Sequence, residues 1–136
     1  MEECIFCKIA EGKMPSEKIH EDEKTMTFMD IAPSNKGHCL VITKKHYETF
    51  NDVPEDELKN LISVTQKISN AIVSATSCHG YNVFMNNNKA GGQIVPHVHF
   101  HIVPRFEGDG VAHEWKKTKY IEGEMKEYGE AIRKRL

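Results

Sequence analysis

The sequence predicts an α+β fold in which five short strands form an antiparallel sheet. Short apolar or alternating segments are separated by tight polar turns, and only one long segment has helical periodicity. A parallel sheet needs a crossover helix between successive strands. No strand–helix–strand unit repeats along the 136 residues, so an antiparallel sheet is favoured. We therefore expect one long helix and a C-terminal helix beside an antiparallel sheet.

The first third of the chain contains three predicted strands. A short helical or looped segment covers Cys4 to Ala10, and "GKMP" then breaks the chain. Two strands, Lys18 to Glu21 and Thr25 to Asp30, flank an acidic turn, and the strongly apolar "HCLVITKK" at 38–45 forms the third. The short turn between the first two strands favours their antiparallel pairing.

The one strongly periodic segment begins after residue 50. Asp52 is its predicted N-cap, because Glu55 three residues later matches a capping box. The stop signal is the sequence Cys-His-Gly at 78–80. The apolar stripe expected to face the core consists of Leu58, Leu61, Ile62, Thr65, Ile68 and Ile72.

Two further strands and a thinner helical stripe complete the chain. "YNVFMN" at 81–86 is the fourth predicted strand, the turn "NNKAGGQ" follows, and "VPHVHFHIVPR" at 95–105 is the fifth. The tail has helical spacing at Ile121, Met125, Tyr128 and Ile132. With no repeat or linker between these elements, residues 1–136 are expected to form a single domain.

Composition and charge exclude several classes of partner. The hydrophobic fraction of 39% and charged fraction of 28% suit a globular domain, and a net charge of -2 leaves no cationic excess for nucleic acid. The start "MEECIFCKIA" has acids where a signal peptide needs cations, and no apolar run is long enough to cross a membrane. We expect a cytoplasmic protein in which Cys39 and Cys78 are ordinary buried thiols.

Three of the eight histidines occupy alternate positions in the fifth strand. Because alternate strand residues share a face, His97, His99 and His101 are expected to form an exposed row above a core that buries Val98, Phe100 and Ile102 on the other face. Packing alone does not require three imidazoles in register. The row therefore indicates either a metal site or rings that transfer protons and attack phosphorus.

A second set of candidate ligands lies far from this row in the sequence. "CIFC" supplies Cys4 and Cys7, which suit a metal site or a redox motif, and His46 in "TKKHYETF" is a further candidate. Two thiolates and two imidazoles make a Cys2His2 set suitable for zinc. A site closed by four protein ligands has no position for water and is structural, so the remaining histidines would perform any chemistry.

The segment 97–103 is similar to the full signature of the histidine triad family: histidine, apolar, histidine, apolar, histidine, apolar, apolar. The similarity extends from "CIFCKIAEGKMPSEKIHEDE" through "FMDIAPSNKGHCLVITKKH" to "NNNKAGGQIVPHVHFHIVPR". It covers a motif-bearing core of about 4–105 and leaves a variable tail at 106–136. The resemblance implies a zinc-bearing, nucleotide-binding α+β protein that is usually a homodimer.

The resemblance also implies a reaction, hydrolysis of nucleoside phosphoramidates or dinucleoside polyphosphates, with purines preferred. His99 is the implied nucleophile, which would form a covalent nucleotidyl-histidine that water then hydrolyses. His101 would bind the phosphoryl oxygens or protonate the leaving group, and it favours hydrolysis because transferases of the family have glutamine there. His38 matches a fourth histidine that supports the triad.

Other positions match the nucleotide and metal sites of the family. Asp30 corresponds to the carboxylate that binds the ribose hydroxyls, and Phe28 and Ile31 line the base pocket. The residues at the α-phosphate and its surroundings are Asn86, Gly92 and Gln93. The ligands implied for one structural zinc ion per chain are Cys4, Cys7, His46 and His97. The resemblance also implies that His97 orients the nucleophile.

One departure and three other histidines complete the comparison with the family pattern. Ile94 replaces a serine of the most similar branch, so this chain lacks the hydroxyl that would help to bind the phosphate or the leaving group. The remaining histidines, His20, His79 and His113, are expected to be surface or capping residues. Two alternatives stay open: a nucleotide-binding or scaffold protein with incidental hydrolysis, and a metallohydrolase whose HxHxH row holds a catalytic metal.

Overall fold

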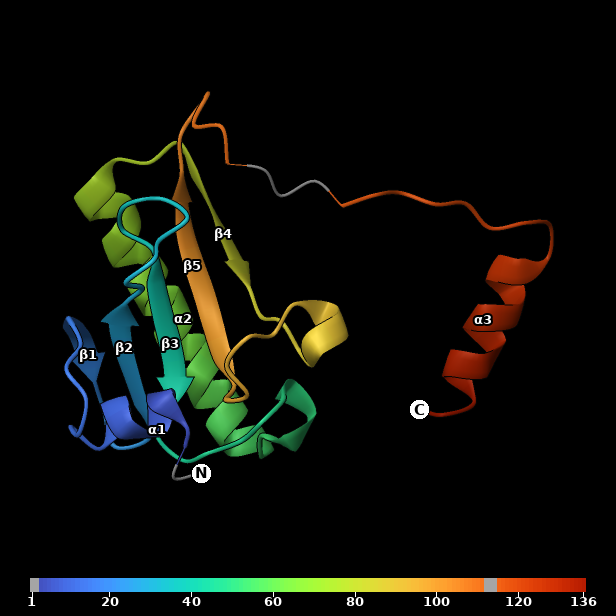
Figure 1. The fold of residues 1–136 in the computed structure, drawn as a ribbon. Helices are drawn as coiled ribbons and strands as arrows, with labels where there is room; N and C mark the ends of the chain where they lie inside the picture. Colours follow the sequence, from blue (N-terminus) through green and yellow to red (C-terminus); the bar gives the residue numbers. More distant parts are fainter. Residues whose placement is uncertain (1–2, 112–114) are drawn as a thin grey trace.

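The computed structural model describes residues 3–111 and 115–136. It contains a five-stranded antiparallel sheet, as predicted, and the strands lie in the order β1-β2-β3-β5-β4 with α2 on one face (Figure 1). The strands are β1 (Lys18–Glu21), β2 (Thr25–Met29), β3 (Cys39–Thr43), β4 (Gly80–Phe84) and β5 (His99–Arg105). The helices are α1 (Ile5–Ala10), α2 (Glu55–Thr76) and α3 (Glu124–Arg133), with short 3-10 turns η1 (Phe50–Asp52) and η2 (Lys89–Gly91).

The fifth strand is shorter than its apolar pattern predicts. It begins at His99 instead of Val95, because Pro96 lacks an N–H and the two amides that follow donate outside the sheet. The amide of His97 donates to the carbonyl of Val95, and that of Val98 donates to the carbonyl of Tyr47. His97 therefore lies outside the regular alternation of β5.

The long helix begins later than predicted, and it buries Leu61, Thr65, Ile68 and Ile72 of the predicted stripe. Asp52 is not its N-cap but closes η1, where its carboxylate accepts from the backbone of Thr49, and Pro54 precedes the first residue of α2. Ile62, predicted to face the core, is 54% exposed, while Val64 is buried beside Leu61 and Ile68. This stripe covers Phe100 and Ile102 on one sheet face, as the alternation of β5 predicts.

The opposite sheet face packs against α1. Phe6 and Ile9 of α1 contact a cluster that includes Met26, Phe28, Leu40 and Ile42. Cys39 is buried among the α2 contacts as expected, but Cys78 is only half-buried because it follows the end of α2. The face under α1 is also the face of His99 and His101 in the strand register.

The C-terminal segment extends away from the sheet and ends in α3, on the side of the body where β4 is the edge strand (Figure 1). The helix forms where the apolar spacing predicts it. Within the described part of the chain, no helix has the length and apolarity needed to cross a membrane.

Candidate active site and metal centre

Two histidines of the triad, His99 and His101, have cross-strand partners in the sheet. The backbone register pairs Leu40 with His101 and Ile42 with His99, and on the other side of β5 it pairs Phe84 with His101. Phe84 stacks on the His101 ring with centroids 4.5 Å apart and planes 7° apart. The rings of His99 and His101 are neighbours, with centroids 4.8 Å apart. This pair is the centre of the candidate active site.

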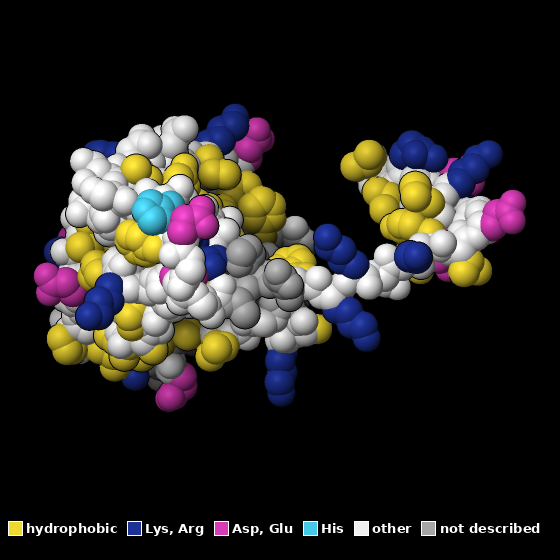
Figure 2. Space-filling view, turned by 90° about the horizontal axis from the view of Figure 1, so that it is seen from above, with side chains coloured by type: hydrophobic (Ala, Val, Ile, Leu, Met, Phe, Trp, Pro, Cys, Tyr) yellow, Lys and Arg dark blue, Asp and Glu magenta, His cyan; other side chains and the backbone are white. Residues whose placement is uncertain are grey.

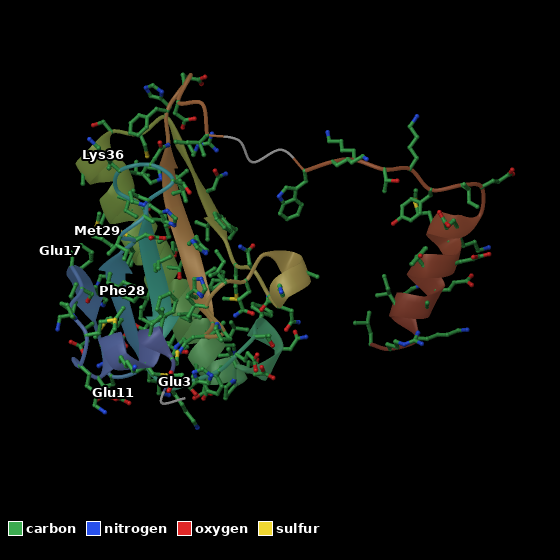
Figure 3. The ribbon with its side chains drawn as sticks, in the orientation of Figure 1. Glu3, Glu11, Glu17, Phe28, Met29 and Lys36 are labelled. Carbon is green, nitrogen blue, oxygen red and sulfur yellow. The ribbon has the colours of Figure 1, made fainter. Side chains whose placement is uncertain are left out.

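The prediction of an exposed histidine row is wrong. His97 is fully buried and His99 is 5% exposed, because α1 and the segment before β5 cover them. Phe6 of α1 meets the His99 ring edge-on at 5.0 Å between centroids, and Phe28, labelled in Figure 3, packs against Phe6. Only His101 is partly open among the three.

His97 is oriented toward the two cysteines. Its Nε2 lies 2.7 Å from the carbonyl oxygen of Thr43, which can only accept, so Nε2 carries the proton. The lone pair is then on Nδ1, which lies 3.3 Å from the Sγ of Cys4 and 3.5 Å from the Sγ of Cys7. A backbone carbonyl behind a ligating imidazole is the usual way to fix its tautomer at a metal.

Four side chains from three distant segments converge at this point. The Nδ1 of His46 lies 3.3 Å from the Sγ of Cys7, and the ligand atoms of Cys4, Cys7, His46 and His97 all lie within 4.8 Å of one another. Cys4 caps α1, and its sulfur accepts from the amide of Cys7 at 3.4 Å. Two thiolates and two neutral imidazoles at these separations fit a tetrahedral zinc ion.

His38 determines the proton position on His101. The amide of Ser34 donates to Nδ1 of His38 at 3.1 Å, so the proton of this ring is on Nε2. That nitrogen lies 3.0 Å from Nδ1 of His101 and 3.7 Å from a carboxylate oxygen of Asp30. The shorter contact makes Nδ1 of His101 an acceptor and places the His101 proton on Nε2.

His99 has the complementary tautomer. Its Nδ1 lies 2.6 Å from the carbonyl oxygen of His97, so Nδ1 donates and Nε2 has the lone pair. Burial lowers the pKa of His99 and of His38, and it lowers the pKa of His101 to about 4. All three rings are therefore neutral at pH 7, with a nucleophilic nitrogen on His99 and an N–H donor on His101.

Three residues matched to the nucleotide site come from the end of β2 and the turn after it. Asp30 follows β2; one carboxylate oxygen accepts from the amide of Ala32 at 2.8 Å, and the other is the oxygen near His38. Phe28 is buried within the α1 cluster, whereas Ile31 is 96% exposed. Of the two residues expected in the base pocket, Phe28 packs against side chains of the cluster around α1, and Ile31 is not part of this cluster.

The glycine turn after β4 is internally hydrogen-bonded. The amides of Gly91, Gly92 and Gln93 donate to carbonyls of the same turn, so an anion would have to compete for them. Gly92 adopts φ +92, and the side-chain amide of Asn86 donates to its carbonyl at 3.3 Å. The side chain of Gln93 connects Asn88 to Glu48 through two hydrogen bonds, and Ile94 is 93% exposed.

Some site residues were not found from the sequence. Phe84 and Phe6 were missed because their ring contacts depend on strand order and on the position of α1, which no local pattern gives. Ser34 and Thr43 act through backbone groups, which leave no signal in side-chain type. Of the other histidines, His79 accepts from the amide of Glu107, while His113 lies outside the described residues.

Comparisons with known proteins identify the family of this chain. A family model described as the HIT domain matches residues 11–108, and an uncharacterized HIT-like protein of Methanocaldococcus jannaschii is 46% identical over 119 residues, covering 88% of this chain and 92% of that protein. The chain therefore belongs to the HIT domain family, as the triad signature predicts. An adenosine 5'-monophosphoramidase of Schizosaccharomyces pombe is 36% identical over 134 residues, 98% of each chain.

Solved structures show the same fold. A crystal structure from Streptococcus mutans has a TM-score of 0.93 and 36% identity, covering 99% of this chain and 86% of that one. A zinc-bound histidine triad family protein of Mycobacterium smegmatis has a TM-score of 0.78 and 35% identity, covering 86% and 85%. The α+β class and the antiparallel sheet are thus confirmed.

Proposed function

We propose that this protein is a nucleotide hydrolase that cleaves at the α-phosphate of nucleoside phosphoramidates or dinucleoside polyphosphates. The observation that carries the proposal is the tautomer pair: an unprotonated Nε2 on His99 beside a protonated Nε2 on His101. Nucleophilic displacement at phosphorus needs these two roles on adjacent groups. The adenosine 5'-monophosphoramidase relative supports nucleoside phosphoramidates as substrates.

In the proposed mechanism, Nε2 of His99 attacks the α-phosphorus, and the bond from phosphorus to the leaving group breaks. Nε2–H of His101 gives its proton to the departing amine or phosphate. Water then gives a proton back to Nε2 of His101 as its oxygen attacks the phosphorus, the bond to His99 breaks, and nucleoside monophosphate is released. The carbonyl of His97 fixes the nucleophile, while His38 is a positioning residue that keeps the acid tautomer of His101.

Binding would use the residues around this pair. Asp30 is proposed to accept the ribose hydroxyls with the carboxylate oxygen that Ala32 does not occupy, and Phe28 and Ile31 are proposed for a purine base. Asn86, Gly92 and Gln93 remain proposed for the α-phosphate and its surroundings. Ile94 offers no hydroxyl on that side, so the leaving group must be recognised by other groups.

A structural zinc ion is proposed for the Cys4, Cys7, His46 and His97 cluster. The carbonyl-fixed tautomer of His97 and the helix-cap geometry of Cys4 support this assignment. When bound, zinc would connect α1, the segment after β3 and the segment before β5. His97 would thereby hold the carbonyl that orients His99, so the metal centre would support the nucleophile without taking part in the reaction.

A symmetric homodimer is also proposed. Among the residues that the structure describes, β4 is an edge strand that pairs only with β5, and its residues are exposed or only half-buried. An edge strand of this kind is a template for pairing with another chain. Tyr81 and Val83, 46% and 42% exposed, would be buried by such pairing.

The substrate class is tested by turnover of adenosine and guanosine phosphoramidates and dinucleoside polyphosphates, with cytidine and uridine analogues as the base control. We expect release of nucleoside monophosphate, faster for the purines. Tight binding without turnover across the panel would instead support the nucleotide-binding or scaffold alternative. The metallohydrolase alternative is less favoured, because His97 points away from the pair and Nε2 of His38 already carries a proton.

The role of His101 gives a prediction that depends on the leaving group. His101→Ala should lower kcat for an amine leaving group by about 10²-fold to 10⁴-fold, because a basic amine needs protonation as it departs. With a nitrophenolate leaving group, which departs without a proton, the loss should be much smaller. Equal losses for both substrates, measured in the same buffer, would refute an acid role for His101.

A further inference from the structure

The loop between β2 and β3, residues 30–38, is hydrogen-bonded to the strand that carries the histidine pair. The side-chain amide of Asn35 donates to the carbonyl of Pro104 and to a carboxylate oxygen of Asp109, each at 2.9 Å. Pro104 is a fully buried residue of β5, three positions after His101. The loop therefore lies at the end of the sheet where β5 ends (Figure 1).

Close packing holds the same loop in place. Gly37 has φ +101, and a Cβ at this position would lie 3.1 Å from Cγ of Pro104 and 3.2 Å from Cγ2 of Thr76. Glycine suits a backbone that has a positive φ and approaches β5 and α2 so closely. In the view onto this end of the body, α3 lies well apart from it (Figure 2), so the body itself makes these contacts.

Asp109 is a fixed acceptor for Asn35. Its carboxylate accepts from Nε and Nη2 of Arg105 at 2.9 Å and 3.0 Å, and from the backbone amides of Phe106 and Val111 at 3.0 Å each. The Arg105 guanidinium and these amides hold the pKa of Asp109 well below its usual range, so the carboxylate is charged at pH 7. A charged acceptor forms a stronger hydrogen bond than a neutral one, which favours one position of Asn35.

The anchored loop presents the amide of Ser34 to His38. This amide donates to Nδ1 of His38 at 3.1 Å, and the carbonyl of Asn35 accepts from the amide of His38 at the same distance. With a donor facing Nδ1, the ring proton is on Nε2, which donates to Nδ1 of His101. Without that donor, the His38 ring can take the other tautomer, in which Nε2 accepts a proton from Nδ1 of His101. His101 then has no proton on Nε2 for a leaving group.

We propose that Asn35 is a positioning residue for the general acid His101. By anchoring the loop, it keeps the amide of Ser34 against His38, and the proton of His101 then stays on Nε2. The inference rests on the hydrolase function proposed above and extends it to a residue outside the histidine row. A variant of Asn35 should lose acid catalysis and keep the nucleophile, because the hydrogen bond that orients His99 comes from another segment.

The kinetic test compares two leaving groups in Asn35→Ala, with leaving-group release measured in a single turnover. With an amine leaving group the rate should fall by about tenfold or more, because fewer molecules hold His101 in its acid tautomer. With a nitrophenolate leaving group, which departs without a proton, the rate should stay within about twofold of the wild type. The matched control is Lys36→Ala, an exposed position of the same loop (Figure 3), which should leave both rates unchanged.

Nuclear magnetic resonance of ¹⁵N-labelled protein reads the tautomers independently of turnover. In the wild type, His38 and His101 should both have their proton on Nε2. In Asn35→Ala, protonation of Nδ1 should rise at both rings together, because one tautomer change forces the other. The isosteric Asn35→Asp, which sets a carboxylate against Asp109 and the Pro104 carbonyl, should act in the same direction.

Three results would overturn the proposal. Equal losses with both leaving groups would show that Asn35 has only a structural role. Unchanged tautomers in a variant that has lost turnover of the amine substrate would exclude the route through His38, and unchanged rates in both Asn35 variants would exclude any role. If the wild type released neither leaving group, the hydrolase proposal would fail, while the tautomers would still decide whether Asn35 sets the proton position.

Discussion

Replacement of His99 by alanine should abolish turnover while preserving the nucleotide pocket. Loss of the attacking nitrogen should lower kcat for an adenosine phosphoramidate by at least about three orders of magnitude, since each 1.36 kcal/mol of barrier costs about tenfold in rate. The affinity for adenosine monophosphate should change little, because the proposed ribose and base contacts come from Asp30 and Phe28. Steady-state kinetics and calorimetric titration measure the two quantities separately.

The matched control is His20→Ala, which removes a half-buried histidine of β1 that lies outside the motifs. It should retain full turnover and affinity. A His99→Ala variant that still turns over at more than about a tenth of the normal rate would exclude this ring as the nucleophile. Loss of nucleotide binding together with turnover would place His99 in substrate binding instead.

Removal of the proposed zinc ion should have the largest effect on stability. Structural zinc contributes on the order of 10 kcal/mol of folding free energy in small domains, so Cys4→Ser should lose the metal and lower the melting temperature strongly. Cys78→Ser is the matched control, because Cys78 is a free, half-buried thiol outside the ligand cluster. Metal analysis of the purified proteins should find one zinc ion per chain in the control and none in the Cys4 variant.

Two outcomes would contradict the structural-zinc assignment. Zinc retained by Cys4→Ser at the level of the control would show that the ligand set is different. An unchanged melting temperature with lost turnover would indicate a catalytic metal. A structural zinc site predicts a different result, in which the variant is destabilised but keeps some turnover at low temperature.

The sequence was most informative where one chemical pattern repeats locally. Alternation placed His99 and His101 on one face and Phe100 and Ile102 on the other, and the structure has this arrangement. The cysteine pair with His46 and His97 was also identified, and the structure brings these four residues together. Strand and helix types followed from periodicity because hydrophobic spacing reflects burial directly.

The errors arose where the outcome depends on tertiary packing. The exposed histidine row was wrong because α1, which precedes the sheet in sequence, covers His97 and His99. Ile62 is exposed although its predicted neighbours Leu61 and Thr65 are buried, because the position of α2 on the sheet decides where the buried stripe ends. The tautomers of His38 and His99 depend on backbone groups of Ser34 and His97, which only the folded chain brings into contact.

The central claim is that a nucleotide becomes covalently attached to His99 during turnover. Rapid quenching of the wild-type protein with a substrate labelled in the nucleotide, under conditions where attachment is faster than hydrolysis, followed by peptide mapping, tests it most directly. The expected result is a labelled peptide containing His97 to His101, with the nucleotide on Nε2 of His99. A label on His38 or His101, or no covalent species while substrate is being consumed, would contradict this account.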